Sequence, residues 1–314
     1  MKKYYVLAAA VIALAACSSE EENEQAWNGE IRLSAVNVVE SRAAQGIQST
    51  EFLSGEKIAV FINEDTSDEP SVTYTQPVVY TTDDAGNLST TTPQFYPQNG
   101  NGVNIFGVYP YDAATDVNGT AVAFSVQSNQ NTEANYKASD LMVGEPASNP
   151  VSKSTSSVQL NFKHCLTKIN INLLAGDGMT NNELNGAEVT IGGVTNSATF
   201  NVKSGVVTAV TGTAAADYVE LGGLTANNGT IGGSAIIIPQ DVTSGTDFFK
   251  IVIEPNSNNP TVYTYTLPAN TTFTAGAAYT YNITVKKSGL TMNPPTITNW
   301  LDGGTVNGDA VPVP

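Results

Sequence analysis

A stretch in the middle of this chain alternates apolar with polar side chains and restricts the possible folds more than any other feature. In residues 158–163 every second side chain is apolar, and residues 169–173 continue the pattern after a break at His164 and Cys165. Successive side chains of a β-strand point to opposite faces, so a period of two predicts strands with one buried face. Residues 279–286 have the same period, and helical periodicity is nearly absent.

Short runs of β-branched and aromatic residues predict further strands on both sides of that stretch. Gly and Asn separate these runs, as in Gly192-Gly193 and in residues 227–229. The expected strands cover residues 31–39, 57–62, 72–80, 103–109, 121–126, 158–173, 187–192, 198–203, 205–210, 230–238, 247–254, 261–267 and 277–286. Residues 129–135 are expected to form a polar loop.

The composition is typical of an extracellular all-β protein. The 314 residues are 41% hydrophobic and only 13% charged, and they include 27 glycines and 15 prolines, which favours strands and turns over helices. The chain is long enough for two ordinary domains. We therefore expect two β-sandwich domains in tandem, residues 29–164 and residues 165–314, with their junction in or beside the alternating stretch.

The first residues have the pattern of a secretory signal peptide. Lys2 and Lys3 precede an apolar run over residues 4–13, which is far shorter than the ~20 residues of a membrane-spanning helix. Residues 14–17, Leu-Ala-Ala-Cys, resemble the bacterial lipobox. This resemblance implies a signal peptide over residues 1–16, cleavage before Cys17 and acylation of the Cys17 thiol. An ordinary signal peptide with a chance cysteine is the alternative.

Residues 17–28 are expected to form a lipidated, acidic tether. An acidic run directly after a lipidated cysteine is similar to the surface-export signal of some Gram-negative lipoproteins, although it also fits a solvated spacer. The formal net charge is −16, and loss of residues 1–16 removes two basic residues and no acidic one, which gives −18. Such a surface repels nucleic acid and anionic lipid, so acyl chains would have to anchor the protein to the outer membrane.

The cysteine and histidine counts argue against an enzyme. With Cys17 assigned to lipid, Cys165 has no partner for a disulfide and is expected to be a buried, small apolar residue. The single histidine, His164, is accompanied by no Gly-x-Ser-x-Gly motif. A structural hydrogen bond is therefore the favoured role for His164. A zinc site would need more His and Cys residues than remain, so we expect no catalytic residue, metal or cofactor.

Six blocks carry a resemblance to a known family. They are residues 138–144, 158–171, 236–240, 273–276, 279–285 and 297–300. In this order and spacing they resemble the fimbrillin family, the Mfa-like subunits of type V pili. The resemblance implies two transthyretin-like β-sandwich domains, export as a lipoprotein, and assembly with other fimbrillin subunits into a surface fimbrium. It implies neither catalysis nor a cofactor.

The same resemblance implies a maturation step. In that family an arginine-specific protease cuts after the first strand, and a strand from another subunit fills the groove that opens. Here the expected first strand is residues 31–39, and Arg42 follows it in a small, polar loop. The bond between Arg42 and Ala43 is therefore the candidate cleavage site, and a simple solvated loop residue is the alternative. Arg32, the other arginine before residue 100, lies inside the strand.

The donor strand is less clear from the sequence. Residues 308–314 alternate, but Pro312 and Pro314 lack N–H groups on one side, so we expect this tail to lie at an edge or to hang free.

The alternative function is a surface lipoprotein that binds glycan without polymerising. A host or bacterial surface glycan or protein is the further class of candidate partner. Tyr279 and Tyr281 could stack on sugars, although a packed sandwich face is favoured. Trp300 is expected to cover the second core rather than to form an exposed ligand platform.

Overall fold

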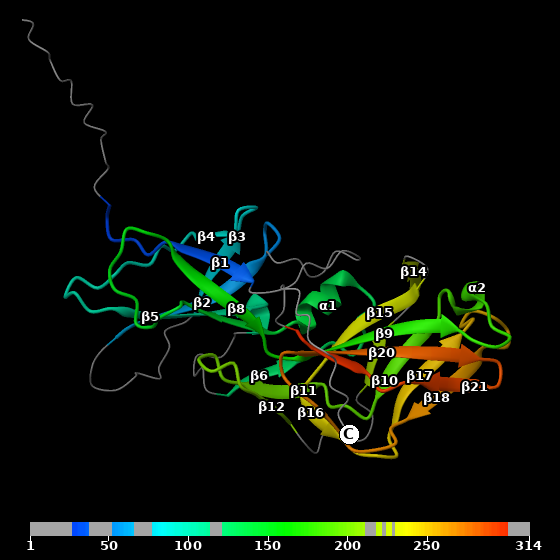
Figure 1. Ribbon diagram of the computed structural model, residues 1–314. Coiled ribbons are helices and arrows are strands. Elements are labelled where there is room, and N and C mark those ends of the chain that lie inside the picture. The colour runs from blue at the N-terminus through cyan, green and yellow to red at the C-terminus, as the bar shows by residue number, and fades with distance from the viewer. Residues whose placement is uncertain are drawn as a thin grey trace, which may run out of the picture.

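The computed structural model describes residues 27–37, 52–65, 77–113, 121–210, 218–221, 224–227 and 230–300. These residues form an elongated molecule with two β-rich halves (Figure 1). Only three short helical segments occur among them: η1 (Tyr111–Ala113), α1 (Glu133–Ser139) and α2 (Asn181–Leu184). The prediction of an all-β fold is confirmed.

Seven strands of the N-terminal half form one sheet that closes on itself. In order around the sheet, the strands are β1 (Leu33–Asn37), β4 (Asn87–Ser89), β3 (Val78–Thr82), β2 (Lys57–Glu64), β5 (Val103–Tyr109), β7 (Met142–Glu145) and β8 (Val158–His164). The sheet closes because β1 pairs antiparallel with β4 and parallel with β8. One buried cluster, which includes Ile58, Val60 and Leu160, fills the interior.

The C-terminal half is a sandwich of two sheets. The larger sheet contains β14 (Thr225–Asn227), β15 (Thr230–Ile237), β9 (Thr167–Ala175), β20 (Ala277–Lys286) and β21 (Gly289–Met292), and β22 (Thr296–Asn299) also pairs with β20. The opposing sheet contains β13 (Tyr218–Leu221), β10 (Glu188–Gly192), β17 (Asp247–Ile253) and β18 (Thr261–Thr266). Alternate side chains from both sheets meet in one core, where the rings of Phe249 and Tyr281 lie 4.9 Å apart.

A small sheet joins the two halves. It consists of β12 (Val207–Ala209), β11 (Ser197–Phe200) and β6 (Val122–Ser125), so it combines chain from both sides of residue 164. Phe61 and Phe106, on the outer face of the closed sheet, belong to the same apolar cluster as Phe124 of β6 and Phe200 of β11. The core is thus continuous between the halves. The division at residues 164 and 165 stays a prediction, and it would separate β6 from its partner β11.

The remaining pair of strands, β16 (Gln240–Val242) and β19 (Thr271–Phe273), forms a two-stranded sheet. Most expected strands are present at nearly the expected positions. The stretch 158–173 is two strands, β8 and β9, which belong to different sheets. The loop expected at 129–135 leads into α1, whose N-cap residue Thr132 accepts a hydrogen bond from the Asn135 N–H. Residues 38–39 of the strand expected at 31–39, and residues 72–76 of the strand expected at 72–80, lie outside the described residues.

Candidate assembly site

The first strand fills a slot between two others. β1 pairs in parallel with β8 over its whole length, from Leu33 opposite Val158 to Asn37 opposite Phe162, and contacts β4 at Leu33 and Ser34. The segment before it is also held at its backbone, because the Ile31 N–H donates to the Gln94 carbonyl at 2.8 Å. β1 therefore has hydrogen-bonded neighbours on both sides (Figure 1).

Three side chains of this segment point into the closed sheet. Ile31, Leu33 and Ala35 are only 2%, 2% and 3% exposed and belong to the interior cluster, whereas Arg32 is exposed and Ser34 is half-buried. This alternation is the expected period of two. Burial of Ile31 and Leu33 together contributes about 3–6 kcal/mol to holding the strand in place.

The position of β1 in the chain makes its removal topologically simple. It precedes every other described strand, and the strands β4, β3, β2, β5, β7 and β8 remain joined to one another without it. Loss of β1 would therefore convert a closed sheet into an open one with two unpaired edges, at β4 and β8. Unpaired edges are templates for pairing with another chain.

The neighbouring strand β8 is held by contacts of its own Phe162 side chain. The ring of Phe162 lies flat over two glycines: a Cβ built on Gly107 would come within 2.5 Å of the ring, and one built on Gly144 within 2.6 Å. Phe52 packs edge-on against the same ring at 5.0 Å. Because these contacts involve β5, β7 and residue 52, none of them depends on β1. Gly107 lies inside the predicted strand 103–109, and a glycine inside a strand often marks a close approach of another group to the backbone. This was the sequence signal for the contact with Phe162.

Two buried tyrosines lie beside the start of the β1 segment. The hydroxyls of Tyr80 and Tyr96 are buried and have no hydrogen-bond partner among the described residues. Burial raises the pKa of Tyr80 to about 12, and the negative charge of Glu30 adds to this effect. The Tyr96 ring contacts Trp27 edge-on at 6.1 Å, and the Tyr96 N–H donates to the Gly29 carbonyl. The sequence analysis did not single out either tyrosine.

The site residues expected from the sequence lie outside the described part of the chain. Cys17, Arg42 and Ala43 are among them, and so is the tail 308–314. Lipidation at Cys17 and cleavage after Arg42 therefore stay predictions. Within the described residues, β1 ends at Asn37, five residues before Arg42.

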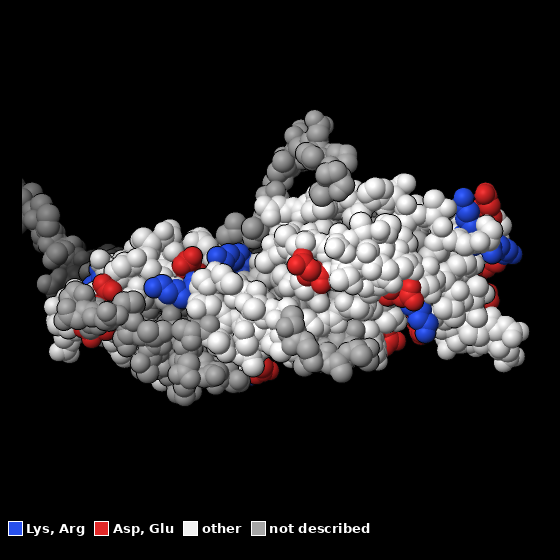
Figure 2. All heavy atoms as spheres, turned by 90° about the horizontal axis from the view of Figure 1, so that it is seen from below, with Lys and Arg blue, Asp and Glu red and all other residues white. Residues whose placement is uncertain are grey.

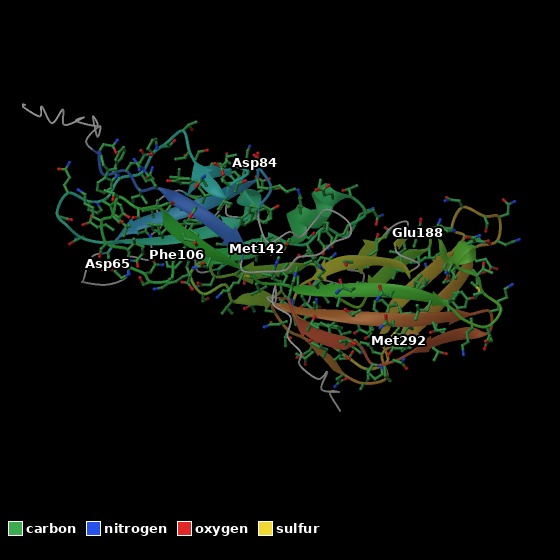
Figure 3. The ribbon with its side chains drawn as sticks, turned by 45° about the horizontal axis from the view of Figure 1, so that its top comes forward. Asp65, Asp84, Phe106, Met142, Glu188 and Met292 are labelled. Atoms are coloured by element: carbon green, nitrogen blue, oxygen red, sulfur yellow. The ribbon has the colours of Figure 1, made fainter. Side chains whose placement is uncertain are left out.

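His164 makes the buried hydrogen bond that the sequence favoured. Its Nδ1 atom lies 2.7 Å from Asp140 Oδ1, and both side chains are buried. The imidazole ring stacks on the indole of Trp300 at 4.1 Å between centroids and 7° between planes. His164 pairs with Met142, which lies where the closed sheet meets the C-terminal half (Figure 3). The stack therefore joins the end of β8 to the residue that follows β22.

The remaining predicted residues are packed as expected. Trp300 is 1% exposed and belongs to the second core, so it covers that core and is not an exposed ligand platform. Tyr279 and Tyr281 are 3% and 2% exposed, which leaves neither ring face open for stacking on a sugar. Cys165 is a free, buried cysteine, and burial raises the pKa of its thiol to about 12.

Neither a metal centre nor a membrane helix emerges from the described ranges. They hold no group of three or more His, Cys, Asp or Glu side chains arranged to bind a metal ion. None of their helices is long and apolar enough to cross a bilayer. Figure 2 shows that charged side chains of the described residues form small, separate groups on the face drawn there.

The fold and the site define an all-β protein whose first strand occupies a slot in a closed sheet. Residues 41–300 match the fimbrillin-like family, so the chain belongs to that family. It is 28% identical over 223 residues to a candidate fimbrium subunit, Fim1C, of Bacteroides uniformis, covering 69% of this chain and 68% of that protein.

Two solved structures have the same fold. A candidate cell adhesion protein from Bacteroides ovatus aligns with a TM-score of 0.66 at 21% identity, over 86% of this chain and 96% of that one. A candidate cell adhesion protein from B. uniformis aligns with a TM-score of 0.63 at 20% identity, over 87% of this chain and 99% of that one.

Proposed function

We propose that this protein is a structural and adhesive subunit of a bacterial surface fimbria, exported as a lipoprotein and assembled by strand exchange. Membership of the fimbrillin-like family and similarity to a candidate fimbrium subunit support the fimbrial role. The observation that carries the assembly mechanism is β1, a first strand paired on both sides and buried through Ile31, Leu33 and Ala35. Its partners are other fimbrillin subunits.

The exchange follows from the energetics of the slot. Removal of β1 exposes apolar side chains of the interior cluster and the hydrogen-bonding groups of two edges. An extended strand from another subunit would restore both the main-chain hydrogen bonds and the alternate apolar contacts, as in other cases of β-strand addition. The open form is therefore expected to take up a donor strand or to associate with other exposed surfaces.

Cleavage between Arg42 and Ala43 would release β1. Arg32 and Arg42 are the only two arginines in the sequence, so an arginine-specific protease has two possible sites. The carbonyl of Arg32 accepts a hydrogen bond from the Val158 N–H at 2.8 Å, which protects the bond that follows it. Cleavage is therefore expected after Arg42 alone.

The test is limited digestion of the purified precursor with an arginine-specific protease, followed by mass spectrometry and sizing. We expect a fragment that begins at Ala43, together with new species of high mass that resist mild heating in detergent. Arg42→Lys keeps the positive charge but removes the cleavage site, and it should stay intact and monomeric. Resistance of Arg42 in the wild type, or cleavage that leaves β1 bound and the protein monomeric, would refute strand exchange.

The lipid anchor requires a separate experiment. Wild type and Cys17→Ala are compared by labelling cells with a clickable fatty acid, and we expect label only on the wild type. Equal label on both would exclude Cys17 as the acylation site. Protease treatment of intact cells tests surface exposure, and complete protection would contradict it. One acyl chain binds a membrane only marginally, with an association constant of roughly 10⁴ M⁻¹, so stable anchoring implies at least two chains.

A further inference from the structure

The strand β18 forms an open edge of the C-terminal sandwich. It pairs with β17 on one side only, and no described segment pairs with its other side. With six residues it is the longest of the unpaired edge strands among those described. Its open side therefore presents N–H and C=O groups that can pair with another strand.

This edge lacks most of the features that usually block pairing, although β21 of the facing sheet lies close to it without pairing. Proteins protect edge strands with Lys, Pro, bulges or a covering segment. The sequence of β18 is Thr-Val-Tyr-Thr-Tyr-Thr, without charge, Pro or Gly. The one irregularity in this ladder lies in β17, between Asp247 and Phe249, so β18 itself stays regular. Val262 is 52% exposed, whereas Tyr263 and Tyr265 are half-buried against the core.

The strand is also complementary to a second copy of itself. In an antiparallel pair with Thr264 opposite Thr264, Tyr263 lies opposite Tyr265 and Val262 lies opposite Thr266. Cross-strand aromatic pairs of this kind stabilise a ladder by about 0.2–1 kcal/mol each. From this register and the open edge, we infer that β18 is a self-association surface, which pairs with β18 of a second copy about a two-fold axis at Thr264.

Charge favours this contact over others between two copies. The chain has a net charge of −16, so most surface contacts between copies bring acidic groups together, whereas β18 itself carries no charged residue. Two charged residues of β17 lie opposite β18: Lys250 opposite Thr264, and Asp247 opposite Thr266, whose hydroxyl donates to the Asp247 carboxylate at 2.7 Å. In the pair, the two Asp247 residues lie on opposite sides of the axis and are farther apart than the two Lys250 residues. Across the paired strands, the Lys250 residues of the two copies would lie about 14 Å apart, or three strand spacings. That exceeds the Debye length of about 8 Å at physiological salt.

One such contact is weak. A pair of six-residue strands buries much less than the ~1,000 Å² of a stable interface, so single copies should associate only transiently. If copies are arranged in register along two neighbouring polymers, many such contacts form at once, and their binding free energies add to give a stable lateral association. The pairing needs neither β1 nor its removal, so it is independent of strand exchange.

Disulfide trapping tests the register. The chain from Ser18 onward keeps every described residue and lacks Cys17, and its remaining Cys165 is buried. Under mild oxidation Thr264→Cys should form a covalent dimer at least about tenfold faster than the control Val262→Cys, because paired Cα atoms lie within disulfide range. Two Val262 positions would lie about 14 Å apart, four residues along the strands and one strand spacing across. A mixture of Val262→Cys and Thr266→Cys should form the heterodimer faster than either forms a homodimer.

A second variant tests the pairing itself. Thr264→Lys places two charges opposite each other on the axis, and Thr264 is exposed, so the fold should be unaffected. When it is added to both chains of the Val262→Cys and Thr266→Cys mixture, heterodimer formation should fall to the rate of the Val262→Cys control, with an unchanged thermal unfolding midpoint. Equal dimer rates for Thr264→Cys and Val262→Cys, or no effect of Thr264→Lys, would overturn the inference.

Discussion

Replacement of Leu33 by Ala tests the central claim that β1 is held by its buried face. Leu33 is 2% exposed and lies opposite Leu88 of β4 and Val158 of β8. Truncation of a buried leucine to alanine costs about 2–5 kcal/mol, because apolar contacts are lost and a cavity remains. The uncleaved protein should therefore unfold at a lower urea concentration. Ser34→Ala, on the opposite face of the same strand, should change stability little.

The same substitution predicts a faster release of β1. After cleavage between Arg42 and Ala43, only non-covalent contacts hold the strand, so the lost free energy appears in its dissociation constant. At 1.4 kcal/mol per tenfold change, a loss of 2–5 kcal/mol weakens retention by roughly 30-fold to 4,000-fold. The released fragment carries Trp27, whose indole Nε1–H donates to the Glu30 carbonyl and whose ring packs against Tyr96.

Release can be followed by sizing with mass spectrometry and by the red shift of Trp27 emission in a Trp300→Phe background. The expected order of release rates is Leu33→Ala well above Ser34→Ala, and Ser34→Ala close to wild type. The reasoning fails if Leu33→Ala and Ser34→Ala unfold at the same urea concentration and release the fragment at the same rate. That result would show that the buried face of β1 does not determine its retention.

Three further predictions concern the packing around the two halves. Gly144→Ala places a Cβ about 2.6 Å from the Phe162 ring and should cost about 1–3 kcal/mol in urea unfolding; adding Phe162→Leu should recover part of the loss. His164→Gln removes the stack on Trp300, so it should cost about 0.5–1.5 kcal/mol and shift Trp300 emission, and loss of a hydrolytic activity without loss of fold would contradict its structural role. The pKa of Tyr80 is raised from 10.0 to about 12 in the folded state, so its neutral form stabilises the fold fully below pH 10, and this contribution is lost as the pH rises from 10 to 12. Tyr80→Phe should flatten this part of the urea midpoint's pH dependence, and an unchanged profile would exclude Tyr80 as its source.

The alternating segments show how much of the fold the sequence contains. Within residues 169–173 of β9 and 279–286 of β20, every second residue is buried, as the sequence pattern predicts. The burial of Trp300 and the hydrogen bond of His164 also followed from the sequence. These features depend on local chemistry, namely the period of the strands and the types of side chain in them. In the candidate site, the buried face of the first strand could be predicted, and Cys17 and Arg42 stay predictions.

Tertiary structure alone decided how the strands pair. The period of two gives each strand a buried face but does not select its neighbours, so nothing local shows that β1 pairs with β8, about 125 residues later in the chain, or that β8 and β9 belong to different sheets. Short strands such as β4 carry too few residues for a detectable period, and α1 is fixed by its cap at Thr132 and its packing. Contacts between distant segments also close the first sheet and place the Phe162 ring against Gly107 and Gly144. Only the folded chain brings those backbones within van der Waals distance of each other.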